Sequence, residues 1–341
     1  MANSFKKRNL LLQKRISNPI FPHLLLRDKS EKATVTARKP FTKEATRPIT
    51  IARQNTASIN RRIDMPNRIL QRVLSEGRIQ EIKNYDIGSQ LGSGAYAIVK
   101  SSVHKTTGQT VAIKIYEKYK LASSQRKSCV NREVRVLKNI NHPHIVKFYD
   151  VIETPKEVYI IMELVKGHSL LHYIKQKSEK RLTEYEAIRI FKQILLAIEY
   201  CHKMNVVHRD IKMENILLDD RLDAKLIDFG FSTWVIPAQK LKIFCGTPSY
   251  MAPEIVNKKE YYGPPADMWS LGILLYAMLC GHFPFRAHTE FELYRNISKG
   301  IFNVPSHVSE GAKKLISKLL SVDPKRRITA EKASIDPFLN L

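Results

Sequence analysis

The stretch that decides the fold of this chain is HRDIKMEN, residues 208–215, which lies between the short apolar runs 206–207 and 216–218. It holds a carboxylate at Asp210, a cation at Lys212 and an amide at Asn215 within one loop. Asp210 can accept or orient a hydroxyl proton, and Asn215 can coordinate a hard metal ion through its amide oxygen. Because Lys212 can neutralise phosphate charge, the loop predicts chemistry on a phosphate group.

A second carboxylate, Asp228, lies in IDFG, residues 227–230, where apolar residues lead directly into the acid. A single Asp before Phe-Gly could be a turn residue. Two such loops in this order favour a shared site instead.

A glycine-rich stretch, LGSGAYAIV, residues 91–99, lies upstream of both loops. Glycine lets a backbone approach phosphate oxygens without a clash from Cβ. A dinucleotide-binding turn would need a helix after the glycines, but residues 96–103 alternate like a strand. The dinucleotide interpretation is therefore rejected, and an ordinary glycine hairpin stays open beside a phosphate-binding loop.

A lysine, Lys114, ends the strand-like run VAIK, residues 111–114. A charge among such apolar neighbours is costly unless it is paired. Glu133 is a candidate partner because it shares a helical face with Val130 and Leu137. On this pair alone, a structural role is favoured over a chemical one.

The hydrophobic pattern places strands first and helices later. Strands are predicted over 87–99, 110–116 and 158–162, and helices over 121–139, 183–202 and 266–281, the last of which is apolar enough to be buried. This order predicts an α+β fold with two lobes, a small β-rich one followed by a larger helical one.

Taken together, these motifs and APE at 252–254 resemble the signature set of eukaryotic protein kinases over about residues 85–338. Lys212 and GTPSY, residues 246–250, resemble the serine/threonine class. The large lobe resembles the calmodulin-kinase-related group, near the AMP-activated and microtubule-affinity-regulating kinases. The resemblance implies a bilobal kinase domain over 85–339, with an N-lobe over 85–162, a hinge over 163–166 and a C-lobe over 167–339.

The resemblance also implies ATP and Mg²⁺ as cofactors and a role for each site residue. Lys114, held by Glu133, would contact the α- and β-phosphates. Asp228 and Asn215 would hold magnesium, and Asp210 would orient the substrate hydroxyl while Lys212 and Thr247 steady the site. The residues implied to contact the nucleotide are Leu91, Gly92, Ser93, Gly94, Val99, Ala112, Lys114, Met162 as gatekeeper, Glu163 and Val165 at the hinge, and Leu217. Arg327 is expected to pair with Glu254.

Three departures from the family pattern carry information. Ala97 replaces the third glycine, which stands furthest from the phosphates and puts little in doubt. Between Thr233 and Thr247 the segment has no Ser, Thr, Tyr, Asp or Glu, and Ile243 occupies the usual place of an activating Thr. We therefore expect the segment to be held by apolar contacts of Ile243 and Phe244, or by a partner, without a phosphate.

Substrate preference is the third departure. Glu214 suits an upstream Arg, but Ser169 and Ala277 occupy two further positions that are acidic in Arg-preferring kinases. The sequence therefore predicts only a modest preference for basic sites.

The charge of the chain is unevenly distributed. Of its 341 residues, 57 are Lys or Arg and 32 are Asp or Glu, giving +25, and residues 1–84 hold 19 and 6 of these. Residues 1–84 are predicted to form a basic extension, largely disordered, with a candidate helix at 66–83 that links, packs on the domain or binds a partner. The extension is predicted to stay solvated or to contact acidic protein or anionic lipid. Specific nucleic-acid binding is not expected without interleaved aromatic residues or a zinc motif.

Other classes of protein are disfavoured. The longest apolar run, 271–281, is too short for a transmembrane segment, and the N-terminal leucine run is too short for a signal peptide. Four widely spaced cysteines argue against a zinc site or disulfide framework and predict an intracellular, cytoplasmic location.

Three functions remain open on the sequence alone. They are an active serine/threonine protein kinase acting on protein substrates, a catalytically silent pseudokinase scaffold, and a basic tethering protein whose kinase domain is incidental. The four residues Lys114, Asp210, Asn215 and Asp228 favour the first. Since the chain ends at Leu341, soon after the domain, regulation is expected through the extension, partners or abundance.

Overall fold

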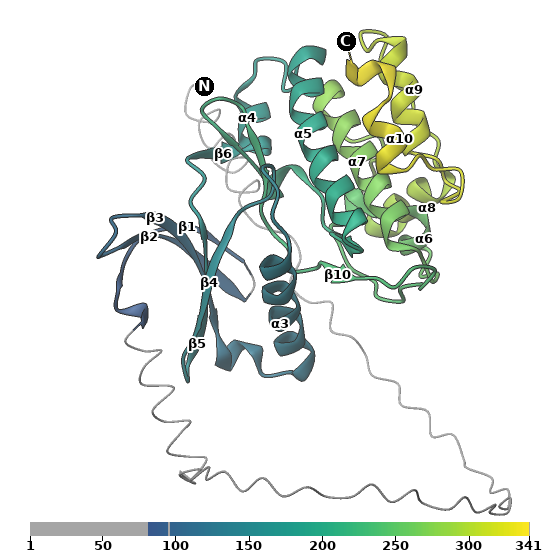
Figure 1. Ribbon diagram of the computed structural model, residues 1–341. Coiled ribbons are helices and arrows are strands. Elements are labelled where there is room, and N and C mark those ends of the chain that lie inside the picture. The colour runs from purple at the N-terminus through teal and green to yellow at the C-terminus, as the bar shows by residue number, and fades with distance from the viewer. Residues whose placement is uncertain (1–80, 95, 341) are drawn as a thin grey trace, which may run out of the picture. The chain divides into compact units, whose positions relative to one another are not determined.

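A computed structural model describes residues 81–94 and 96–340 of the chain (Figure 1). The predicted basic extension and most of the candidate helix at 66–83 therefore lie outside the described residues. The end of that helix is described, with Glu81 and Ile82 helical and a turn at Lys83 and Asn84. None of the helices in the described ranges is long and apolar enough to cross a membrane.

The first lobe is built on a five-stranded antiparallel sheet in the order β1-β2-β3-β5-β4. Its strands are β1 (Tyr85–Ser93), β2 (Ala97–His104), β3 (Thr110–Glu117), β4 (Phe148–Glu153) and β5 (Glu157–Glu163). The predicted strand over 87–99 is wrong, because the chain turns at the glycines and forms two strands instead of one. The sequence pattern also missed β4, an edge strand with only Ile152 fully buried and hence little alternation.

One helix, α3 (Ser124–Asn139), accompanies this sheet (Figure 1). Ser123 caps its first turn by accepting a hydrogen bond from the Arg126 backbone N–H at 3.2 Å. The predicted start at 121 is too early because residues 118–121 form a separate 3₁₀ turn. Val130, Glu133 and Leu137 are buried on one face, which confirms the predicted face.

The second lobe is mainly helical and lies beside the sheet in Figure 1. Its helices are α4 (Leu170–Gln176), α5 (Glu184–Lys203), α6 (Pro253–Val256), α7 (Gly263–Cys280), α8 (Glu290–Lys299), α9 (Glu310–Leu319) and α10 (Ala330–Ser334). α7 is buried over almost its whole length, as its apolar sequence predicts. It ends at Gly281, whose φ of 72° and whose closeness to the Lys180 carbonyl both require glycine.

Short strands in the second lobe bring the two predicted acidic loops together. β6 (Gly167–Ser169), β8 (Ile216–Asp219) and β9 (Ala224–Leu226) form one small sheet, and β7 (Val206–Val207) pairs with β10 (Thr233–Trp234). Ile216 faces Leu226 in the β8–β9 hairpin, and the Ile227 N–H donates to the Asn215 carbonyl at 3.0 Å. Asn215 and Asp228 therefore lie at the same end of one hairpin.

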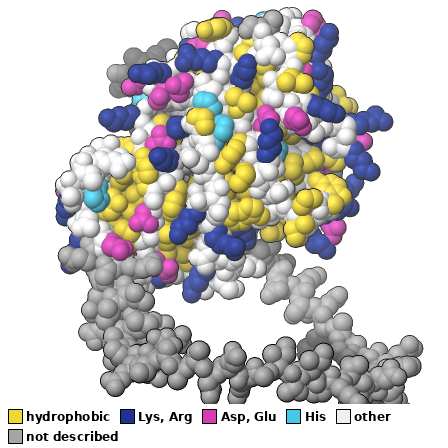
Figure 2. Space-filling model, viewed as in Figure 1, with side chains coloured by type: hydrophobic (Ala, Val, Ile, Leu, Met, Phe, Trp, Pro, Cys, Tyr) yellow, Lys and Arg dark blue, Asp and Glu magenta, His cyan; other side chains and the backbone are white. Residues whose placement is uncertain are grey.

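The predicted α+β, two-lobed fold is confirmed. The expected ion pair between Arg327 and Glu254 is present too, since Arg327 holds the Glu254 carboxylate through two hydrogen bonds of 2.8 and 3.0 Å. Figure 2 shows Lys and Arg side chains around the helical lobe, so the positive charge is not confined to the extension.

Candidate phosphoryl-transfer site

A cleft of about 570 Å³ is lined by residues of both lobes. All eleven residues predicted to contact a nucleotide line it: Leu91, Gly92, Ser93, Gly94, Val99, Ala112, Lys114, Met162, Glu163, Val165 and Leu217. Glu133, Asn215 and Asp228 line it as well. The residues that the family resemblance implies for the site come from six separate stretches of sequence, and they share one cavity.

Lys114 sits at the centre of an ion-pair cluster. Its Nζ lies 2.6 Å from Glu133 Oε1 and 3.0 Å from Asp228 Oδ1. Burial alone would lower the pKa of Lys114, but the two carboxylates outweigh burial and raise it well above its ordinary value. The lysine is therefore charged at neutral pH.

Asp228 is held in its ionised form by the same cluster. Burial would raise its pKa, whereas Lys114 and a hydrogen bond from the Gly230 N–H at 3.1 Å lower it below the ordinary value. A carboxylate that faces the cleft and stays charged can bind a metal ion.

Asp210 belongs to a second cluster, in the loop between β7 and β8. Lys212 Nζ lies 2.7 Å from Asp210 Oδ2, and Thr247 donates from Oγ1 to Asp210 Oδ1 at 2.8 Å. Lys212 also donates to Thr247 Oγ1 at 3.0 Å, which closes a triangle. The structure thus joins Asp210, Lys212 and Thr247, three residues that lie up to 37 positions apart.

Asn215 bonds to the second cluster and lines the cleft that the first cluster also lines. Its amide nitrogen donates to the backbone carbonyl and the carboxylate of Asp210, at 2.9 and 3.1 Å. The amide oxygen remains as an acceptor, beside the cleft that Asp228 also lines. One carboxylate and one amide oxygen suit Mg²⁺, which takes few protein ligands and completes its octahedron with water and phosphate oxygens.

The glycine loop is the turn between β1 and β2. A Cβ built on Gly92 meets nothing within 4 Å, and one on Gly94 meets only the Ala97 carbonyl, at 3.8 Å. Packing within the protein therefore does not require glycine at these positions, whereas close approach of an anion to the backbone would. The strand after the loop agrees with rejection of a dinucleotide-binding turn.

The hinge follows β5. Met162 is buried and pairs with Ala112 across the sheet. The Glu163 N–H already donates to the Lys147 carbonyl at 2.9 Å, so this donor is not free for a ligand. The backbone of Val165 has no hydrogen-bond partner among the residues that the structure describes. Its N–H and its carbonyl are therefore both available to a ligand.

Two residues that organise the site were missed by the sequence analysis. Asp267, fully buried on α7, accepts from the backbone N–H groups of His208 and Arg209 at 2.9 and 2.8 Å. The Tyr116 hydroxyl donates to Glu133 Oε2 at 2.5 Å. A lone carboxylate in the apolar run 266–281 was a signal for Asp267; nothing comparable marked Tyr116.

The segment between Thr233 and Thr247 is only partly as predicted. Phe244 packs against the core, with its ring 6.1 Å from that of Tyr294. Ile243, in contrast, is 51% exposed, so the prediction that its side chain anchors the segment is wrong. Its backbone carbonyl does the anchoring instead, because it accepts from the Tyr261 hydroxyl at 3.0 Å.

Comparison with known proteins matches residues 85–339 to the protein kinase domain. The chain is 45% identical over 253 residues to "Serine/threonine protein kinase OSK3" of Oryza sativa subsp. japonica, covering 74% of this chain and 49% of the relative. It is 42% identical over 259 residues to "SNF1-related protein kinase catalytic subunit alpha KIN12" of Arabidopsis thaliana, covering 76% and 52%.

A third relative is the "Carbon catabolite-derepressing protein kinase" of Saccharomyces cerevisiae, 42% identical over 260 residues, covering 76% of this chain and 41% of the relative. The chain therefore spans about half the length, or less, of the curated relatives it matches. The match nevertheless extends over three quarters of this chain and includes every motif of the cleft. The chain belongs to the protein kinase family.

Proposed function

We propose that this protein transfers the γ-phosphoryl group of Mg-ATP to serine and threonine hydroxyls of protein substrates. The observation that supports this most directly is the convergence of Lys114, Asp228 and Asn215 on one cleft, with Asn215 bonded to Asp210. The relatives' names agree with it, since one is a named serine/threonine protein kinase.

Each residue has a distinct part in this proposal. Lys114 binds α- and β-phosphate oxygens and is oriented by Glu133. Asp228 and Asn215 would hold Mg²⁺, which would neutralise charge on the phosphates. Asp210 orients the attacking hydroxyl and accepts its proton, and Lys212 and Thr247 fix the carboxylate that does so. The protein thus acts by positioning and by charge stabilisation, and it needs no covalent intermediate.

Substrate preference and location follow as further parts of the proposal. Glu214 is exposed and lines the cleft beside Asn215, so it is placed to attract a basic residue, and we propose a modest preference for basic sites. The four cysteines are all free, which supports a reducing, cytoplasmic location. Contacts of the basic extension with acidic protein or anionic lipid remain a proposal from charge alone.

A radiolabelled-ATP assay on the full chain tests the activity. Asp210→Ala should lower phosphate incorporation into a Ser/Thr peptide library by roughly 10²–10⁴-fold, because it removes the group that orients the hydroxyl. Asp220→Ala, an exposed aspartate outside the cleft, is the matched control and should keep wild-type activity. Equal background incorporation by all three proteins would favour the pseudokinase scaffold instead.

A further inference from the structure

A second hollow, of about 540 Å³, opens on the helical lobe between α4 and the loop that follows α7. We call it the basic groove. It is lined by Leu171, Ile174, Lys175, Lys180, Met213, Ser249, Ala277, Gly281, His282, Phe283, Phe285, Arg286, Ala287 and Leu293. The lining is an apolar floor with three cations and no Asp or Glu.

The cations of the groove are not neutralised within the protein. Within residues 81–94 and 96–340, neither Lys175, Lys180 nor Arg286 has a carboxylate oxygen within 4.0 Å. Neighbouring cations differ, since Lys177 is paired with Glu186 and Arg181 with Glu179. Lys180 instead donates from Nζ to the Lys175 backbone carbonyl at 2.5 Å, which brings its ammonium group beside the end of α4. All three side chains are exposed.

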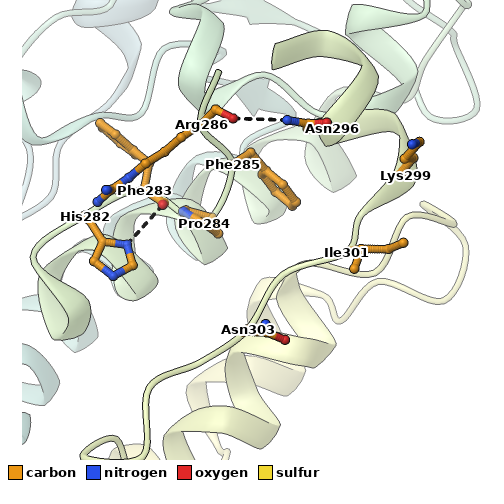
Figure 3. A pocket seen from close by; sticks show the side chains of 9 residues that line it. All are labelled: His282, Phe283, Pro284, Phe285, Arg286, Asn296, Lys299, Ile301 and Asn303. Atoms are coloured by element: carbon orange, nitrogen blue, oxygen red, sulfur yellow. Dashed lines mark hydrogen bonds between the residues drawn. The ribbon is translucent and has the colours of Figure 1, made fainter. Parts of the chain in front are cut away.

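The loop that carries Arg286 is fixed rather than loose. Phe285 is buried and stacks on Trp269 with ring centroids 5.7 Å apart. The Asn296 side chain donates to the Arg286 carbonyl at 3.0 Å (Figure 3). A smaller hollow of about 520 Å³ on the other side of this loop is lined by Lys299 and again by no carboxylate. Both hollows that this loop lines therefore carry cations and no carboxylate.

The basic groove begins next to the residues that would do the chemistry. Met213 is the residue after Lys212, and Ser249 lies two residues after Thr247, whose hydroxyl donates to Asp210. A peptide whose hydroxyl reaches Asp210 would thus place neighbouring residues over the groove. Glu214, the acidic residue that suits a basic substrate residue, lines the nucleotide cleft, whereas the groove holds Ala277 at a position that is acidic in Arg-preferring kinases.

Resting on the proposed kinase function, we propose that the basic groove is a substrate subsite that binds an apolar residue flanked by a carboxylate or phosphate group. Apolar floor and cationic rim together match this occupant, a segment of the protein substrate. The chain's own extension does not fit, because residues 1–84 carry 19 Lys or Arg and 6 Asp or Glu and have the same sign of charge as the groove.

The test uses the full chain and a positional peptide library around a central Ser or Thr, with Ala, Lys, Asp, Glu or phosphoserine at each flanking position. Wild-type protein should favour Asp, Glu or phosphoserine over Ala at one or more positions by roughly threefold to tenfold in kcat/KM, as expected for two exposed charge pairs. The difference should lie in KM, because the groove does not touch the reacting atoms, and should shrink with added salt. Comparing kcat/KM for phosphoserine and Asp at the same position distinguishes a phosphate group from a carboxylate as the preferred anion.

The variant that decides the matter is Lys175→Glu with Arg286→Glu. It should reverse the preference toward Lys at the same positions and leave kcat on the all-Ala peptide and the urea midpoint unchanged. Lys314→Glu, an equal change of charge on the exposed face of α9, is the control and should keep the wild-type profile. Activity without any preference for acidic peptides, or the same preference in the double variant, overturns the subsite and leaves the kinase function standing. If wild type phosphorylates no peptide, both proposals fall.

Discussion

The carboxylate of Asp267 accepts a hydrogen bond from the Arg209 backbone N–H at 2.8 Å, although the two residues lie 58 positions apart. The same carboxylate accepts from the His208 N–H and from His202 Nε2, at 2.9 and 3.0 Å. Burial would raise its pKa, but His202 and the hydrogen bond from the His208 backbone N–H lower it below the ordinary value. α7 thereby fixes the backbone immediately before Asp210.

Asp267→Ala should therefore destabilise the protein and disorder the loop that carries Asp210. It leaves two buried N–H groups without an acceptor, which we expect to cost about 3 kcal/mol. Urea unfolding and peptide phosphorylation measure the two effects. Asp267→Asn, which keeps one acceptor oxygen, should lose less of both; equal behaviour of the two variants would show that the hydrogen bonds are not what matters.

Glu186 gives a pH dependence that can be checked by itself. Burial would raise its pKa, but Lys177, Tyr173 and Thr183 lower it from 4.5 to about 2. A group whose pKa falls on folding stabilises the protein above its unfolded pKa, and this contribution is lost as the pH drops toward the folded value. The unfolding free energy of wild type minus that of Glu186→Gln should be constant from pH 6 to 8.

Below about pH 4.5 that difference should shrink, by an amount on the order of 1 kcal/mol because the group is partly exposed to solvent. Urea midpoints between pH 6 and 3.5 measure it. Glu310→Gln serves as the control, since Glu310 is paired with Lys313 on an exposed helix face and should show much less change. A wild-type difference that stays flat to pH 3.5 contradicts the capping and ion-pair account.

How much could be predicted from sequence depends on whether a contact is local. Asp210 and Asn215 lie five positions apart in one loop, and their side chains are hydrogen bonded. Lys114 and Asp228 lie 114 positions apart, so their 3.0 Å contact followed only from the family resemblance. The role of Ile243 was predicted wrongly. An apolar residue in a loop can expose its side chain while its backbone carbonyl accepts a hydrogen bond, and the pattern of residue types does not reveal this. In the sequence Tyr116 looks like any other strand residue, and only the structure shows that its hydroxyl bonds to Glu133.

Tyr116→Phe isolates the support given to Glu133. Loss of the 2.5 Å hydrogen bond leaves one carboxylate oxygen of a residue that is 2% exposed without this partner. We expect a loss of about 1–2 kcal/mol in unfolding free energy and a higher KM for ATP, because Glu133 orients Lys114. Tyr119→Phe is the control, since Tyr119 is 73% exposed and its bond to Glu117 lies outside the cleft.

The segment after Asp228 should work without phosphorylation. Thr247 donates to Asp210, so a phosphate there would place negative charge against that carboxylate, and the Thr233 hydroxyl lies in β10, where it donates to the Trp234 carbonyl. Arg209 Nε is already occupied by the Phe231 carbonyl, at 2.6 Å. Phosphatase-treated protein should therefore keep its peptide-phosphorylating activity, as measured alongside mass spectrometry of the segment.

Two variants show what holds this segment in the absence of a phosphate. Phe244→Ala removes a ring that packs on Tyr294 and should lower kcat several-fold, because the segment that carries Thr247 loosens. Ile243→Ala removes a half-exposed side chain and keeps the carbonyl that Tyr261 binds, so stability should change by less than about 0.5 kcal/mol and activity should stay. If activity instead collapses after phosphatase treatment and returns when Thr233 or Thr247 is phosphorylated, the segment is a phosphorylation switch and these contacts are secondary.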